Sequence, residues 1–185
     1  LAVQPAFDAR AVVRQVRNEA RPASGDVGQP LDEGEFLIDT SVTLGPALGD
    51  QAAPAMSFDG TNYVVVWQDG RNSNDLNIYG ARVTPQGTVL EPAGFIISQA
   101  TGNQYTPAVA FDGTNFLVVW HDARGGGLSI DIYGARVTPA GVVLDPTGIP
   151  ISLAACVQAC PCLAFDGTDF LVAWEDSRSG YDYDI

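Results

Sequence analysis

Three times in this chain, a tryptophan is followed two residues later by an aspartate and, after two more residues, by an arginine. The pairs are Asp69/Arg71, Asp122/Arg124 and Asp176/Arg178. A guanidinium can bind a carboxylate through two parallel hydrogen bonds, and an aspartate at a strand end can also accept hydrogen bonds from its own loop. One interpretation is that each pair braces its loop or joins neighbouring repeats, as expected of a feature present in every repeat. The other is that the pairs form ligand-binding sites on one face.

The loops that follow these pairs differ from copy to copy, so they are where a ligand specificity would be set. They cover residues 72–77, 125–131 and 179–184, and all three are rich in oxygen donors. Calcium takes oxygen ligands from flexible loops, although none of these loops has the Asp-x-Asp-x-Asp-Gly spacing. We therefore predict no cofactor, with a calcium ion bound by these loops as the alternative. Its candidate ligands are Asp75, Asp131, Asp182 and Asp184.

All cysteines of the chain are crowded into seven residues, at Cys156, Cys160 and Cys162. Their spacing is not the paired Cys-x-x-Cys of a zinc site, and no histidine lies nearby in the sequence. We predict a loop disulfide between Cys156 and either Cys160 or Cys162. Disulfides persist in oxidising compartments, which favours an extracellular, cell-surface or periplasmic location.

Catalysis is not predicted. His121 is the single histidine. Its counterparts in the other copies are Gln68 and Glu175, so we expect a solvated side chain. No Gly-x-Ser-x-Gly accompanies it, and no acidic residue stands out from the repeated background. Paired carboxylates for glycoside hydrolysis are the remaining enzymatic alternative in so acidic a chain.

The Asp-x-Arg pairs belong to a longer repeat. The segment from Phe58 to Arg71 returns at Phe111 and again at Phe165, with steps of 53 and 54 residues. In the first copy a short strand precedes the hairpin turn Asp59–Asn62, and an apolar strand follows over 63–67. Because that strand is apolar at every position, we expect it to be buried on both faces. We place one core tryptophan in each copy: Trp67, Trp120 and Trp174.

A third strand over 78–83 and a fourth within 88–98 complete the copy. Four short antiparallel strands in roughly 40–50 residues are the unit of a β-propeller, so we predict an all-β propeller of four-stranded blades. We divide the chain into a lead-in, 1–32, and repeats over 33–185. The repeats comprise a lone outer strand in 33–50, blades over 54–98 and 107–152, and a partial blade over 161–185. The lead-in is expected to hold a short helix over 11–20, then a linker.

About three blade equivalents are too few for a closed ring, since propellers need at least four. Either the chain is a fragment of a longer propeller, or copies assemble, two chains making six blades. The stop inside a strand favours the fragment.

The charge of the chain limits its partners. The formal net charge is -13, and all nine basic residues are arginine, four of them within the first 21 residues. Such a surface repels phosphate backbones and anionic lipid headgroups, so we predict no nucleic-acid partner. No run of 18 apolar residues occurs, so no membrane insertion is predicted. A protein or a glycan is the expected partner.

The repeat Phe-Asp-Gly-Thr-Asn-Phe-Leu-Val-Val-Trp-x-Asp-x-Arg, followed by Asp-Ile-Tyr-Gly-Ala-Arg, resembles the propeller-type repeats of large secreted and cell-surface bacterial and archaeal proteins, TolB-like and WD40-like in appearance. The resemblance covers residues 34–185. The Trp-Asp dipeptide of true WD40 repeats is absent, and no stretch matches the sialidase Asp-box, Ser-x-Asp-x-Gly-x-Thr-Trp. The resemblance implies adhesion, scaffolding or ligand binding.

Together these observations predict an exported, non-enzymatic β-propeller module for protein or carbohydrate binding or surface assembly. There are two alternatives: the chain is part of a carbohydrate-active propeller enzyme, or it is a structural subunit of a larger surface complex. In the latter, the arginine-rich lead-in would hold acidic neighbours.

Overall fold

The computed structural model describes residues 12–14, 35–37, 50–71, 75–126, 129–180 and 183–185, and within them the chain is all-β. No described segment forms a helix long and apolar enough to cross a membrane. The strands are β1 (Val12–Arg14), β2 (Glu35–Leu37), β3 (Gln51–Phe58), β4 (Tyr63–Asp69), β5 (Asn77–Val83), β6 (Phe95–Ser98), β7 (Gln104–Phe111), β8 (Phe116–Asp122), β9 (Asp131–Val137), β10 (Ile149–Ser152), β11 (Gln158–Phe165) and β12 (Phe170–Asp176).

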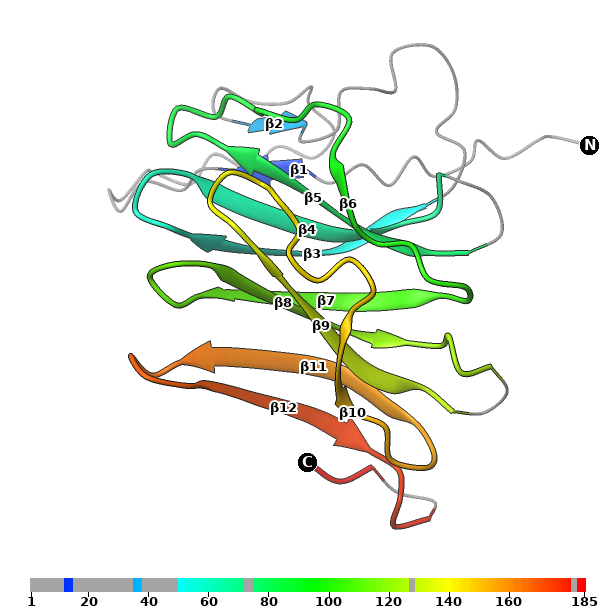
Figure 1. Cartoon of the computed structure of the whole chain (residues 1–185). Coiled ribbons are helices and arrows are strands. Elements are labelled where there is room, and N and C mark those ends of the chain that lie inside the picture. The colour runs from blue at the N-terminus through cyan, green and yellow to red at the C-terminus, as the bar shows by residue number, and fades with distance from the viewer. Residues whose placement is uncertain (1–11, 15–34, 38–49, 72–74, 127–128, 181–182) are drawn as a thin grey trace, which may run out of the picture.

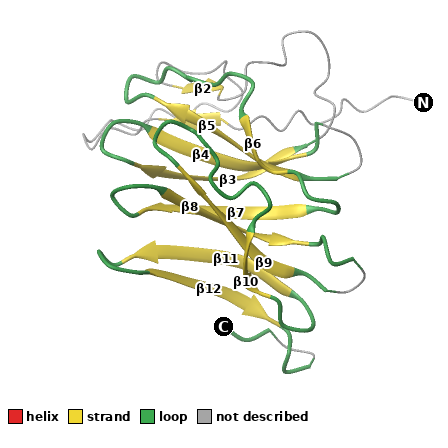
Figure 2. Cartoon of the chain, viewed as in Figure 1, coloured by secondary structure: helices red, strands yellow, loops and turns green. Residues whose placement is uncertain are grey.

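These strands form two complete sheets and two smaller units (Figures 1 and 2). The first sheet has the order β3-β4-β5-β6, and the second sheet repeats it as β7-β8-β9-β10; every pairing is antiparallel. We call β11–β12 the C-terminal hairpin and β1–β2 the N-terminal ribbon. The first strands adjoin one another, β3 on β7 and β7 on β11. The described sheets therefore stack face to face in an open series, with the ribbon at one end and the hairpin at the other (Figure 1).

Each hairpin between the first two strands is closed by an aspartate, as its sequence predicts. In the first copy, Oδ1 of Asp59 accepts hydrogen bonds from the backbone N–H groups of Thr61 and Asn62, both at 2.7 Å. Asp112 and Asp166 do the same in the later copies. The turn thus satisfies its own backbone, which fixes the register of the two strands.

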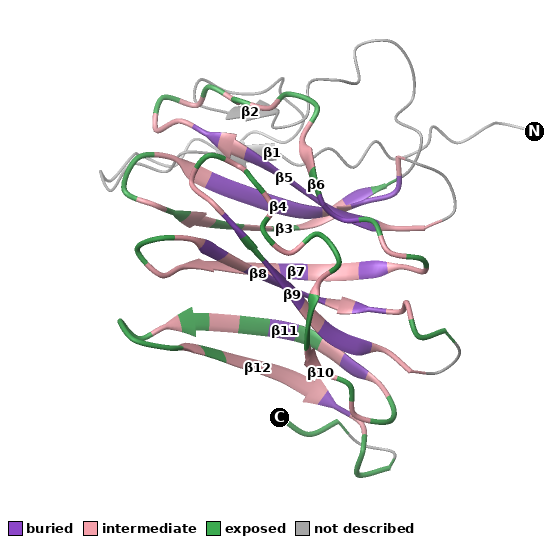
Figure 3. Ribbon diagram, in the orientation of Figure 1, coloured by how far each residue is buried: buried purple, intermediate pink, exposed green. Residues whose placement is uncertain are grey.

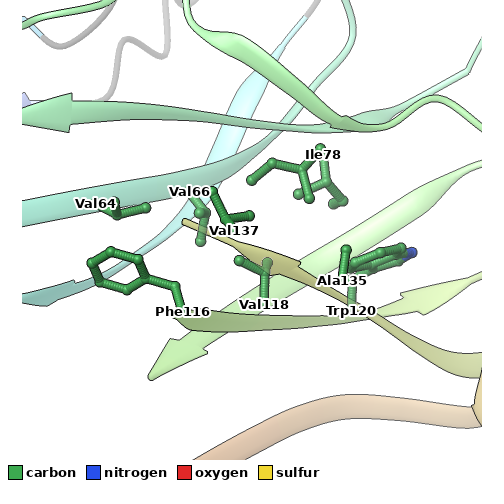
Figure 4. Packing of buried hydrophobic residues seen from close by; sticks show 9 residues of the cluster. Val64, Val66, Ile78, Phe116, Val118, Trp120, Ala135 and Val137 are labelled. Carbon is green, nitrogen blue, oxygen red and sulfur yellow. The ribbon is translucent and has the colours of Figure 1, made fainter. Parts of the chain in front are cut away.

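The second strand of each full sheet is buried on both faces, which confirms the expectation from its unbroken apolar run (Figure 3). Val64 and Val66 point into the layer between the two sheets, where they meet Phe116 and Val118 of β8 (Figure 4). The alternate residues of β4 form a second cluster on the opposite face, with Trp67 against Tyr79 of β5.

One local prediction is wrong. Val12–Arg14, placed in a short helix by the sequence, is a strand paired with Glu35–Leu37. Two consecutive valines favour a strand, and the pairing satisfies backbone groups that an isolated short helix would leave marginal. The rest of the predicted helix lies outside the described residues, as does most of 33–50 around β2. The fourth strand of the first copy is Phe95–Ser98, inside the predicted stretch 88–98, and that of the second copy is Ile149–Ser152.

Gly94 lies at a close approach between the loop before β6 and the core. Its φ is +69°, and an added Cβ would lie 3.1 Å from the Trp67 ring and 3.3 Å from the carbonyl oxygen of Gly80. Gly94→Ala is expected to lower the free energy of unfolding by roughly 2 kcal/mol, from backbone strain and the clash together. Gly60→Ala is the matched control, since Gly60 also has a positive φ, +96°, with nothing within 4 Å. Urea unfolding measures the stability of both variants. An equal loss of stability in the two would contradict this account.

Candidate functional site

Each repeat brings its tryptophan, aspartate and arginine together; we call this set a Trp–Asp–Arg group. Trp67 and Asp69 alternate on β4, so their side chains lie on the same face of the sheet. Nε1 of Trp67 donates a hydrogen bond to Oδ2 of Asp69 at 2.8 Å, and Nε2 of Gln51 donates to the same oxygen at 2.9 Å. Asp69 is completely buried.

Arg71 completes the first group with a bidentate ion pair. Its Nε donates to Oδ1 of Asp69 at 2.9 Å, and its Nη2 donates to Oδ2 at 2.6 Å, while its backbone N–H also reaches Oδ1. The second group repeats this arrangement at Trp120, Asp122 and Arg124, with the two ion-pair distances at 2.9 and 2.7 Å. Charge-assisted forks of this kind are the stronger hydrogen bonds of proteins.

The third and fourth strands close both of these groups. The guanidinium of Arg71 lies 4.4 Å from the ring centre of Tyr79 in β5, and that of Arg124 lies 3.8 Å from Tyr133 in β9. Their Nη1 atoms donate to the carbonyl oxygens of Ala93 and Thr147, just before the fourth strands. The exposed fraction of the side chain is only 22% for Arg71 and 21% for Arg124.

The third group is open. Nε1 of Trp174 lies 3.4 Å from Oδ2 of Asp176, and the side chain of Arg178 is 58% exposed although it still pairs with Asp176 at 2.8 Å. Burial raises the pKa of Asp176, but the hydrogen bonds from Arg178 and Trp174 outweigh it and leave the pKa below its usual value. The group lies in a depression of about 730 Å³, lined by Val172, Ala173, Trp174, Asp176, Arg178, Ser179, Asp184 and Ile185.

The difference between the copies comes from the strands around them. In the first two groups, β4 and β8 lie between two partner strands, whereas in the described residues β12 is paired only with β11, apart from the bridge between Asp176 and Asp184. The aspartates and arginines of the first two groups are engaged with each other and with their own sheet. Their proposed role in ligand binding stays a prediction, and the third group is the one whose donors face open space.

A second set of contacts, between sheets, was missed by the sequence reasoning. Oε1 of Gln68 accepts a hydrogen bond from the backbone N–H of Thr106 in the next sheet, at 3.0 Å. Nδ1 of His121 accepts one from the N–H of Cys160 in the hairpin, at 3.2 Å. The donors share a register shift and a positive φ, 40° at Thr106 and 50° at Cys160, which turn the N–H out of its own sheet. Each is followed by proline, a signal that the sequence does contain.

His121 is therefore not the solvated loop residue that its sequence position suggested. It lies within β8, packs against Tyr105 with ring centres 4.8 Å apart, and binds Oγ1 of Thr106 through Nδ1 at 2.9 Å. Burial lowers its pKa to about 4, against a smaller opposing effect of the Asp122 carboxylate. The contacts of Nδ1 with Thr106 and Cys160 require a neutral imidazole ring whose Nδ1 carries no proton.

An ion pair in each full sheet was also missed. Arg82 pairs with Glu91, and Arg136 pairs with Asp145 through Nε at 2.8 Å and Nη2 at 2.9 Å. In both cases the acid follows the arginine by nine residues, so the repeat could have revealed it. Nη1 of Arg82 also donates to the carbonyl oxygen of Pro139 in the turn after β9, which joins the two sheets.

The predicted calcium ligands do not come together among the described residues, where no group of three or more acidic, histidine or cysteine side chains forms a metal site. Oδ2 of Asp75 accepts from the N–H of Gly102, and Oδ1 of Asp131 accepts from Ser129. Asp184 pairs through its backbone with Asp176. Asp182 lies outside the described residues, so the calcium site stays a prediction.

The three cysteines are exposed free thiols, and the predicted disulfide is not formed in the structure. Cys160 and Cys162 both belong to β11, on either side of the buried Pro161, whereas Cys156 precedes the strand with a φ of 77°. The strand geometry of β11 thus places the thiols toward solvent.

No known protein family matches the sequence, and no curated protein matches it either. Among solved structures, the chain is similar to the crystal structure of alpha-L-arabinofuranosidase from Lactobacillus brevis, with a TM-score of 0.52 and 13% sequence identity. The match covers 77% of this chain and 50% of that one, so this chain spans half the length of the structure it resembles. At this identity the likeness concerns the fold alone.

Proposed function

We propose that this chain is part of an exported β-propeller, with its sheets as the blades, and that it binds a protein partner rather than catalysing a reaction. The repeated strand order and the adjoining first strands support the propeller arrangement. The proposed location is extracellular, cell-surface or periplasmic. The observation that carries the binding function is the open Trp–Asp–Arg group of the C-terminal hairpin.

The first two sheets indicate what kind of segment would bind at the hairpin. β12 presents the backbone edge that β5 covers on β4 and β9 covers on β8. Leu171, 74% exposed, and the half-buried Trp174 add apolar surface beside that edge. An added strand would make main-chain hydrogen bonds along β12, while a tyrosine opposite Trp174 would cover the Arg178 guanidinium. The partner is thus an extended protein segment.

A peptide with the sequence of β9, Asp131–Val137, is the probe for this function. We expect saturable binding at the hairpin, seen as a change in Trp174 fluorescence, because the peptide supplies the strand that Trp120 already contacts in the second sheet. The same peptide with serine in place of Tyr133 is the control and should bind more weakly, since the ring over the guanidinium is lost. Equal binding of the two peptides, or none, would contradict the proposal.

A carbohydrate-active role is the second candidate, and the similar arabinofuranosidase structure is the observation that favours it. The depression holds an indole and the carboxylates of Asp176 and Asp184, groups that suit a sugar. Glycan-array binding together with hydrolysis of arabinofuranoside substrates would support this role. Glycan binding without hydrolysis would support a lectin-like function instead. If the Asp176→Asn variant lost glycan binding or hydrolysis, the site responsible would be the hairpin.

A further inference from the structure

A glutamine begins the first strand of each copy and lies opposite the aspartate of the Trp–Asp–Arg group. The register pairs are Gln51/Asp69, Gln104/Asp122 and Gln158/Asp176. Residues directly opposite each other in an antiparallel pair lie on the same face, so each glutamine side chain is beside its carboxylate. All three glutamines are buried, two of them completely. A polar contact between glutamine and aspartate is therefore within reach in every copy.

The first copy makes this contact directly. Nε2 of Gln51 donates a hydrogen bond to Oδ2 of Asp69 at 2.9 Å. The same oxygen accepts hydrogen bonds from Nε1 of Trp67 and from Nη2 of Arg71. Oδ2 of the buried carboxylate thus has three donors, and one of them is the opposite glutamine.

The second copy uses its glutamine amide differently. Nε2 of Gln104 donates to two carbonyl oxygens of the loop before β7, those of Ala100 at 3.0 Å and Gly102 at 2.5 Å. An amide NH2 group has two hydrogens, so none remains for Asp122. Among the described residues, Oδ2 of Asp122 accepts only from the tryptophan and the arginine of its own group. It therefore has one donor fewer than the equivalent oxygen in the first copy.

The oxygen of the same amide is a buried acceptor. Oε1 of Gln104 has no hydrogen-bond partner in the part of the chain that the structure describes, and neither has Oε1 of Gln158. Nε2 of Gln158 also donates to a loop carbonyl oxygen, that of Ala154 at 2.8 Å. The amide of Gln104 cannot be reversed, because Oε1 would then lie 2.5 Å from the carbonyl oxygen of Gly102. Since an unpaired buried acceptor is costly, the same atom in two copies calls for a donor from outside the chain.

We propose that each of these two copies binds one buried water molecule, which donates one hydrogen to Oε1 of the glutamine and the other to Oδ2 of the opposite aspartate. In the second copy the water joins Gln104 to Asp122, and in the hairpin it joins Gln158 to Asp176. It supplies the donor that Gln51 supplies directly in the first copy. Two polar partners suffice to hold a buried water. The inference goes beyond the proposed function and does not depend on it, because Gln104 belongs to the complete second sheet.

The charges around Asp122 favour water over a cation. Arg124 already pairs with both carboxylate oxygens of Asp122, at 2.9 and 2.7 Å. A cation at Oδ2 would lie beside Nη2 of Arg124, which approaches the same oxygen, and the like charges would repel. Water is neutral and brings two donors, one for each of the two acceptors. The ligand of this site is therefore a single water molecule.

Water–protein NOE spectroscopy tests the proposal on the whole chain in solution. The indole N–H of Trp120 donates to the oxygen that would also accept from the water, so these two donors are neighbours. We expect a cross-peak between the Trp120 indole proton and water, with the NOE and ROE of opposite sign that a long-lived water gives. The Trp67 indole is the internal control and should give none, because Gln51 is the third donor to Asp69. No cross-peak at Trp120, or equal cross-peaks at both indoles, would overturn the proposal.

The variant Gln104→Met tests which residue holds the water. Methionine has a similar length but no acceptor oxygen at this position, so the Trp120 cross-peak should disappear. Gln158→Met is the matched control and should leave that cross-peak unchanged, because it alters the equivalent glutamine of the hairpin. A cross-peak that survived Gln104→Met would overturn the assignment. Unfolding in potassium chloride and in choline chloride of equal ionic strength should give equal stability. Greater stability in potassium chloride would assign the site to a cation and overturn the water.

Discussion

Asp122→Asn is expected to lower the free energy of unfolding by about 3–5 kcal/mol, the usual cost of removing one partner of a buried ion pair. The carboxylate is fully buried and accepts hydrogen bonds from Trp120 and from three nitrogens of Arg124. Asparagine has a similar shape, but its side chain offers one acceptor oxygen instead of two. Its amide NH2 group would face the guanidinium, which is itself a hydrogen-bond donor. Arg124 would then be held over Tyr133 without its counter-charge.

The chain provides its own control for this prediction. Asp176→Asn changes the equivalent residue of the open group, where the arginine is 58% exposed and hydrated. Because water can solvate the exposed guanidinium of Arg178 when its counter-charge is removed, the loss of stability there should be clearly smaller than that of Asp122→Asn. Urea unfolding at one fixed protein concentration measures both variants. Equal losses would show that the third and fourth strands add nothing to the group.

Lowering the pH from 7 to 4.5 is expected to destabilise the protein through His121. Burial holds its folded pKa at about 4, below the value of about 6.5 expected in the unfolded chain. Between these values the unfolded state binds the proton more readily, so stability is complete above about pH 6.5 and is lost as the pH falls toward 4. With the partial exposure of the ring taken into account, the loss is on the order of 2 kcal/mol.

His121→Gln isolates this effect, because Gln68 makes the equivalent contact in the first sheet without titrating. Carboxylate contributions are common to both proteins, so the stability difference between wild type and His121→Gln should shift by about 2 kcal/mol between pH 7 and 4.5. His121 is the single histidine, and its NMR titration should therefore give one midpoint near 4. A midpoint near 6.5 would contradict the buried, neutral ring.

The hairpin turns and the doubly buried second strands could be predicted from sequence because their causes are local. Asp59 closes its turn with N–H groups two and three residues away, and the unbroken apolar run of β4 fits only a strand covered on both sides. At Val12–Arg14, the described part of the predicted helix, the prediction failed because the cause is not local. The partner of Val12–Arg14 begins at Glu35, beyond the reach of a local pattern.

The sequence alone thus determined the repeat, its strands and the recurrence of tryptophan, aspartate and arginine. Only the tertiary structure decided what these residues do, because the contacts that close each group come from other strands and loops. Ala93 contacts Arg71 from the loop before β6, and Cys160 contacts His121 from the next sheet. Three nearly identical motifs become two closed groups and one open group according to the strands that cover them. That difference depends on packing between strands, and no property of the motif itself encodes it.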